Sequence, residues 1–110
     1  MTTITFRTEG DRIVGFDSQG HSGYAEEGAD IVCAAISSTI SLVDVTINDV
    51  LGLAASVKIR EEDAFISIRL PGGLSEFAEH TSQTLMTGLM VYFTQLHDEF
   101  PDNIEVMEED

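Results

Sequence analysis

The sequence predicts an α+β fold of order ββαββαβ, in which one mostly antiparallel sheet packs against two long helices. Short segments that alternate between apolar and polar residues occur in pairs, as in β-hairpins. Two longer segments between them carry apolar residues at helical spacing. The chain has 110 residues, 43% of them hydrophobic, so we expect a single domain over residues 1–110.

The first hairpin is predicted from TITFRT, residues 3–8, and RIVGFDS, residues 12–18, which flank the turn sequence EGD. A glycine-rich loop follows at residues 20–29. Asp30 is a favourable N-cap residue, so an apolar helix is expected at about residues 31–51.

The second hairpin is predicted from SVKIR, residues 56–60, and AFISIRL, residues 64–70, before the chain-breaking sequence PGG. A second helix is expected at about residues 74–97, and a short last strand, IEVM, at residues 104–107. The apolar positions predicted to face the core from the second helix are Ala78, Thr81, Leu85, Leu89, Tyr92 and Leu96.

The first helix carries two apolar flanks. One stripe is predicted to face the sheet and consists of Val32, Ile36, Ile40, Val43, Ile47 and Val50. Ile31, Ala35 and Leu42 form the second flank. A homodimer would bury this second flank, and a broad core face beneath the other helix is the alternative.

The charge balance limits the possible partners. The formal net charge is −15, from 20 acidic and 5 basic residues. Direct binding to nucleic acid is disfavoured, because it requires Lys and Arg against the phosphates. A basic partner is favoured, unless the acidity serves only solubility.

The N-terminal segment lacks the continuous apolar run of a signal peptide. We also see no apolar run approaching the roughly 20 residues that cross a bilayer. A single cysteine excludes an internal disulfide. We therefore expect a cytoplasmic protein that does not contact a membrane.

The segment GHSGYAEEGADIVCAAIS, residues 20–37, holds that cysteine, Cys33. With Asp30 as N-cap, Cys33 would be the third residue of the helix, where the helix dipole and free N–H groups favour a thiolate. His21 lies in the preceding loop, which is long enough to bring its imidazole to the thiol. Such a pair would act as nucleophile and general acid–base. An inert, structural cysteine is the alternative.

Asp30 and Ser37 are candidate supporting residues of this site. Asp30 would cap the helix and orient His21, and Ser37 lies one helical turn beyond Cys33. One cysteine and three scattered histidines do not have the spacing of a metal site. We therefore expect neither a metal nor another cofactor.

The same segment closely resembles the signature of the ribosomal-processing cysteine protease (Prp) family. That signature begins with Gly-His-small-Gly-Tyr, continues with Gly-x-Asp-Ile/Leu-Val-Cys and ends with an Ala-rich stretch and Ser. The matching positions here are Gly20, His21, Gly23, Tyr24, Gly28, Asp30, Val32, Cys33, Ala35 and Ser37. The resemblance also extends to the length of the chain and the order of its elements.

The resemblance implies a small homodimeric cysteine endopeptidase that removes the N-terminal extension of a large-subunit ribosomal protein during ribosome assembly. It implies that Cys33 and His21 are catalytic, and that Gly20, Gly23, Tyr24 and Gly28 belong to a substrate-binding loop. The substrate it implies is apolar and aromatic before the cut and basic after it. Two alternatives stay open: a non-catalytic ribosome-assembly binding module and a thiol redox regulator, which would need an intermolecular disulfide.

Overall fold

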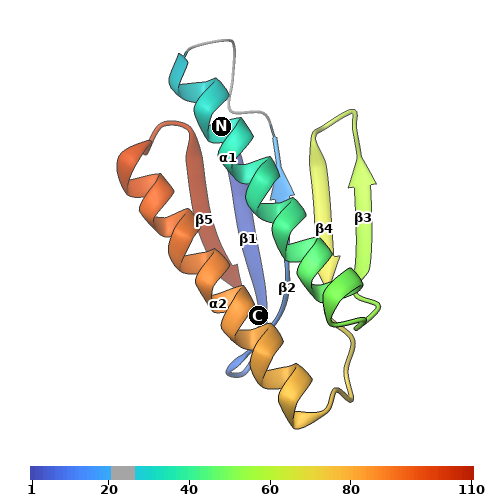
Figure 1. Cartoon of the computed structure of the whole chain (residues 1–110). Helices are drawn as coiled ribbons and strands as arrows, with labels where there is room; N and C mark the ends of the chain where they lie inside the picture. Colours follow the sequence, from blue (N-terminus) through green and yellow to red (C-terminus); the bar gives the residue numbers. More distant parts are fainter. Residues whose placement is uncertain (21–26) are drawn as a thin grey trace.

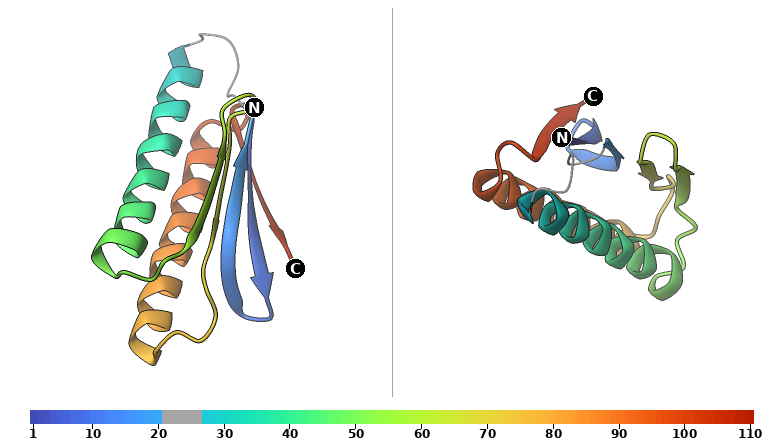
Figure 2. Two further views of the ribbon diagram at one scale, coloured as in Figure 1. Left: turned by 90° about the vertical axis from the view of Figure 1, so that its right-hand side faces the viewer. Right: turned by 90° about the horizontal axis from the view of Figure 1, so that it is seen from above.

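The fold has two layers, a five-stranded sheet and a pair of helices that cover one face of it (Figures 1 and 2). The structure is a computed structural model and describes residues 1–20 and 27–110. Its elements are β1 (Thr2–Glu9), β2 (Arg12–Gln19), α1 (Glu27–Asp44), a π-helical extension of α1 called η1 (Val45–Val50), β3 (Ser56–Arg60), β4 (Phe65–Arg69), α2 (Glu76–Glu99) and β5 (Ile104–Glu109).

The strands lie in the order β3-β4-β2-β1-β5. The pairs β1–β2, β2–β4 and β3–β4 are antiparallel, and only β5 pairs in parallel, with β1. The predicted α+β class, mostly antiparallel sheet and order of elements are confirmed. β2 and β3 run in the same direction and finish at the same end of the sheet. The turn between β3 and β4 therefore lies beside the end of β2 (Figure 1).

The core lies between the sheet and the helices. Alternating residues of β1, such as Ile4 and Phe6, point into it and are fully buried. Phe6 packs against Phe16 of β2 and Phe93 of α2, with ring centroids 5.7 and 6.5 Å away. These aromatic contacts join the first hairpin to the second helix.

The first helix faces the core with the predicted stripe, except at its end. The buried members of the stripe are Val32, Ile36, Ile40, Val43 and Ile47. The prediction for Val50 is wrong, because this side chain is 73% exposed. η1 contains more residues per turn than an α-helix, so the α-helical spacing fails within it and Val50 turns away from the sheet.

The second flank of α1 is divided. Ala35 packs against the core, whereas Ile31 and Leu42 are exposed, Leu42 by 63%. A broad core face therefore accounts for Ala35 only.

Residues Ile31–Val50 have a mean hydropathy of 1.6 and are long and apolar enough to cross a membrane. The expectation that no segment approaches this length is wrong. The hydropathy has a local reason, because one side of this helix supplies part of the core while Leu42 and Val50 remain exposed on the other. A core helix of a soluble protein meets the same criterion.

The second helix begins after Ser75, whose side chain accepts a hydrogen bond from the backbone N–H of Ala78. Its buried residues are Ala78, Ser82, Met86, Leu89, Phe93 and Leu96. The predictions for Ala78, Leu89 and Leu96 are confirmed, and Leu85 packs against the edge of the core. The predictions for Thr81 and Tyr92 are wrong by one position, because Ser82 and Phe93 are the buried residues there. Ser82 is accommodated in the core because its hydroxyl donates to the Glu79 carbonyl, at 3.1 Å.

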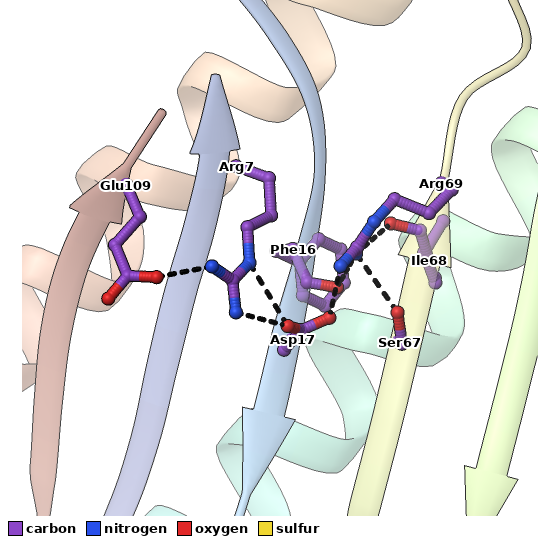
Figure 3. A network of polar contacts seen from close by, with 7 residues as sticks. All are labelled: Arg7, Phe16, Asp17, Ser67, Ile68, Arg69 and Glu109. Atoms are coloured by element: carbon purple, nitrogen blue, oxygen red, sulfur yellow. Dashed lines mark hydrogen bonds and ion pairs between the residues drawn. The ribbon is translucent and has the colours of Figure 1, made fainter. Parts of the chain in front are cut away.

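The opposite face of the sheet carries a polar network across four strands (Figure 3). Asp17 of β2 lies at its centre, 2.9 Å from Nη2 of Arg7 and 2.8 Å from Nη2 of Arg69. Arg7 also pairs with Glu109 of β5, and Nη1 of Arg69 donates to the Ser67 hydroxyl at 2.9 Å. The network ties β5, β1, β2 and β4 together where no helix covers them.

Candidate active site

Cys33 opens into a pocket between α1 and the hairpin formed by β3 and β4. The pocket has a volume of about 460 Å³, and the Cys33 side chain is partly exposed. From α1 it is lined by Cys33, Ile36, Ser37, Ile40 and Ser41, from the hairpin by Ile59, Arg60, Glu61, Ala64, Phe65 and Ile66, and from β1, β2 and the residue after β2 by Thr2, Ser18 and Gly20.

The pocket has an apolar floor beside the thiol. Ile36, Ile40 and Ile66 belong to the core or pack against it and present apolar surface beside the thiol. Ile59 lies on the edge strand β3 and is 66% exposed, so the apolar surface continues outward. A site of this kind suits an apolar side chain next to a group that the thiol attacks.

The structure brings three of the predicted residues together: Cys33, Ser37 and Gly20 line the same pocket. His21, Gly23 and Tyr24 lie outside the described residues. Gly28 and Asp30 lie in the first part of α1.

The start of α1 differs from the prediction. The helix begins at Glu27, so Asp30 lies inside it and is not its N-cap, and Cys33 is its seventh residue. The free N–H groups of a helix belong to its first turn, so Cys33 lies beyond them. The prediction that the helix start stabilises the Cys33 thiolate is therefore wrong. Glu27 and Ala29 favour a helix, and an internal glycine such as Gly28 costs only about 1 kcal/mol.

The hairpin of β3 and β4 is the part of the site that sequence reasoning missed. Arg60 lies over the ring of Phe65, 4.0 Å from its centroid, and its guanidinium pairs with Asp63 at 3.0 Å. This hydrogen bond from Arg60 holds the pKa of the Asp63 carboxyl below its ordinary value. The sequence of the predicted hairpin did not indicate that its tip would lie next to Gly20, because that contact follows from the pairing of β2 with β4.

Gly20, the last described residue before the loop, is held tightly. Its carbonyl accepts a hydrogen bond from Oγ1 of Thr2, and its N–H donates to the carbonyl of Asp63, both at 3.2 Å. Its φ of 95° lies in the region that favours glycine. A Cβ at this position would lie 2.7 Å from the carbonyl oxygen of Met1, so only glycine fits here.

Among the described residues, no group of three or more His, Cys, Asp and Glu side chains is arranged to hold a metal ion. The chemistry that the described pocket offers is that of an accessible thiol beside an apolar surface.

The chain is similar to two bacterial proteases named for ribosomal processing. The ribosomal processing cysteine protease Prp of Bacillus subtilis (strain 168) is 26% identical to it over 107 residues, which are 96% of each chain. The crystal structure of an essential ribosomal processing protease Prp from S. aureus, in complex with a substrate peptide, matches with a TM-score of 0.83 at 17% identity. This match covers 99% of the present chain and 100% of that one.

A protein of known structure from Streptococcus mutans matches with a TM-score of 0.84 at 23% identity, over 99% of this chain and 96% of that chain. At these identities the two structures show that the fold is shared. The family model described as cysteine protease Prp matches residues 1–105. Because this match spans nearly the whole sequence, the chain belongs to the cysteine protease Prp family.

Proposed function

We propose that this protein is an endopeptidase that removes the N-terminal extension of a large-subunit ribosomal protein during ribosome assembly. The observation that carries the proposal is the position of Cys33, a partly exposed thiol in an apolar pocket, in a chain of a cysteine protease family. The Bacillus subtilis relative is named for ribosomal processing, which supports this choice of substrate.

In the proposed reaction, the Cys33 thiolate attacks the carbonyl carbon of the scissile peptide bond and forms a tetrahedral intermediate. The C–N bond then breaks, and His21 gives its proton to the departing amine, which leaves an acyl-enzyme. Water, deprotonated by His21, hydrolyses the thioester and restores the thiol. The apolar floor of the pocket would receive the apolar residue before the cut.

The charge of the chain supports a basic substrate. With a net charge of −15, the protein attracts a basic peptide over a distance of about one Debye length, roughly 8 Å at physiological salt. The part of the substrate after the cut is expected to be basic, so this attraction would speed its capture.

A synthetic peptide that spans the junction between extension and mature ribosomal protein tests the proposal, with products identified by mass spectrometry. We expect a single cut after apolar residues, and loss of cleavage in Cys33→Ala and in His21→Ala. His80→Ala is the matched control, because His80 is an exposed histidine on α2 outside the pocket. Cleavage at the wild-type rate by Cys33→Ala or by His21→Ala would contradict the assignment. Binding of the peptide without cleavage under reducing conditions would favour the binding module instead.

We also propose that the protein acts as a homodimer in the cytoplasm, where ribosomal proteins are assembled. Only 28% of the apolar Ile31–Val50 window is buried, and Leu42 and Val50 project from it into solvent. A second copy of the chain would cover this surface. We expect Leu42→Glu to give a monomer in sedimentation velocity, while Met107→Glu, on β5, leaves the dimer intact.

Reductant separates the dimer from the redox alternative. A dimer formed by the apolar surface of α1 is unaffected by reductant, whereas an intermolecular disulfide through Cys33 would be broken by it. Cell fractionation with an antibody to the protein tests its location, and recovery outside the cytoplasmic fraction would contradict this part of the proposal.

A further inference from the structure

We propose that Thr2 and Asp63 are positioning residues for the cleavage reaction, because they hold Gly20, the residue that precedes His21, from two sides. The inference rests on the proposed function, in which His21 is the partner of Cys33. Thr2 and Gly20 line the same pocket as Cys33, so this anchor lies at the site of the reaction.

Thr2 holds the carbonyl of Gly20. Its Oγ1 donates to this oxygen at 3.2 Å, and Thr2 is only 3% exposed. Thr2 is itself fixed by strand pairing: it lies opposite Ile104 of β5, and its N–H donates to the carbonyl of Asn103 at 3.0 Å. The hydroxyl therefore reaches Gly20 from a rigid part of the sheet.

Asp63 holds the other side of Gly20. Its backbone carbonyl accepts the Gly20 N–H at 3.2 Å, and its carboxylate accepts from Nε2 of Gln19 and from Nη2 of Arg60, both at 3.0 Å. The turn that carries Asp63 is closed by a hydrogen bond from the N–H of Ala64 to the carbonyl of Glu61, at 3.2 Å. Asp63, at the tip of the hairpin, thus binds both Gln19 and Gly20, the last two described residues before the loop.

Both peptide groups of Gly20 are restrained by these contacts. A peptide unit is planar, so a hydrogen bond to the Gly20 carbonyl restrains the whole unit through which the chain continues. Because Gly20 has no side chain, it packs directly against the backbone of Met1, and this contact prevents Gly20 from shifting toward Met1. Thr2 and Asp63 therefore fix the last described residue before His21. An error of about 1 Å in the placement of a reacting group can cost about 100-fold in rate.

The main test compares Thr2→Val, which removes the hydroxyl but keeps the shape, with Thr2→Ser, which keeps the hydroxyl. Thr8→Val is the matched control: it removes a threonine hydroxyl at the other end of β1, where Oγ1 donates to Asp110 at 2.6 Å. We expect Thr2→Val to lower kcat about fivefold with little change in KM, the effect of one lost hydrogen bond. Thr2→Ser and Thr8→Val should retain the wild-type kcat.

A second readout follows the thiol directly. The alkylation rate of Cys33 by iodoacetamide is measured at about pH 6.5 and at about pH 8.5, since the thiolate is the form that reacts. We expect the ratio of the low-pH rate to the high-pH rate to fall in Thr2→Val and in His21→Ala, and to stay at the wild-type value in Thr8→Val. A purely structural role for Thr2 would leave this ratio unchanged.

Asp63→Ala is a second variant at a half-exposed position, and it serves if Thr2→Val does not fold. It keeps the carbonyl that accepts the Gly20 N–H but removes the carboxylate contacts to Gln19 and Arg60 that hold the turn in place. We therefore expect kcat and the alkylation ratio to fall in the same direction as in Thr2→Val, by a smaller amount. If His21→Ala loses cleavage while Thr2→Val and Asp63→Ala keep the wild-type kcat and ratio, this inference alone is overturned. If His21→Ala itself cleaves at the wild-type rate, the proposed function falls and this inference with it.

Discussion

Asp17, on the outer face of the sheet, and Gly20, at the C-terminal end of β2, are held by different kinds of contact. Asp17 is held by two arginines, with side chains that reach across β1, β2 and β4. Gly20 is held by its backbone alone, through one hydroxyl and one carbonyl. Ion pairs between side chains stabilise the sheet around Asp17. The pocket of Cys33 depends instead on the backbone geometry of Gly20, which an added Cβ would disturb.

The largest expected effect is that of Gly20→Ala. The new Cβ would lie 2.7 Å from the carbonyl oxygen of Met1 and would need a positive φ, so we expect kcat/KM to fall about 100-fold. Gly10→Ala is the matched control, since Gly10 also has a positive φ but no neighbour within 4 Å of the added carbon. Peptide cleavage and thermal unfolding are measured for both. Equal activity of the two variants would contradict the claim that catalysis depends on the backbone geometry at Gly20.

Asp17→Asn should act on stability instead. The carboxylate of Asp17 is 15% exposed and accepts from two guanidinium groups, so we expect a loss of about 2 kcal/mol in the free energy of unfolding at neutral pH. The measurement is urea unfolding followed by circular dichroism. kcat should remain near the wild-type value in conditions where the variant is folded. A fall in kcat without a loss of stability would run against this assignment.

The same carboxylate predicts a dependence on pH. Burial raises the pKa of Asp17, but hydrogen bonds from Ser67, Arg7 and Arg69 outweigh it and leave the pKa below its ordinary value. The stabilisation is therefore complete above the unfolded-state pKa, about 3.9, and is lost as the pH falls through the lower folded-state pKa. We expect wild-type stability to fall more steeply than that of Asp17→Asn below about pH 4. Parallel curves for the two proteins would exclude Asp17 as the cause.

The smallest expected effect is on substrate binding at the rim of the pocket. Ile59→Ala removes exposed apolar surface beside Cys33, so KM for the peptide should rise about threefold with kcat unchanged. Lys58→Ala is the control in the same strand, because successive side chains of a strand point to opposite faces. An equal rise in KM for both variants would show that the pocket does not distinguish the two faces of β3.

Sequence patterns predicted the parts of this molecule that rest on local periodicity. The alternation in residues 3–8 and 56–60 and the apolar stripe at Val32, Ile36 and Ile40 depend on neighbours along the chain, and the structure confirms them. Cys33, Ser37 and Gly20 were named as site residues because one short segment holds them, and all three line one pocket, while their roles stay predictions.

The remainder of the site depends on contacts between distant parts of the chain. Asp63 meets Gly20 only because β2 and β4 are neighbours, and Thr2 meets it because β1 and β2 form a hairpin. No local sequence pattern predicts which strands will be neighbours in the sheet. The earlier start of α1 and the π-helical turn at its end were missed for a related reason: an N-cap residue at position 30 and a regular helical spacing were both favourable, but neither was decisive.

The distribution of basic residues between the two layers has a consequence for how a substrate approaches. All five Lys and Arg residues lie on strands, and α1, η1 and α2 contain none while holding several acidic residues. The repulsion that a basic peptide meets therefore comes from the strands, and one of their basic residues, Arg60, lines the pocket itself. We expect added salt to slow the capture of a polycation without altering the chemical step.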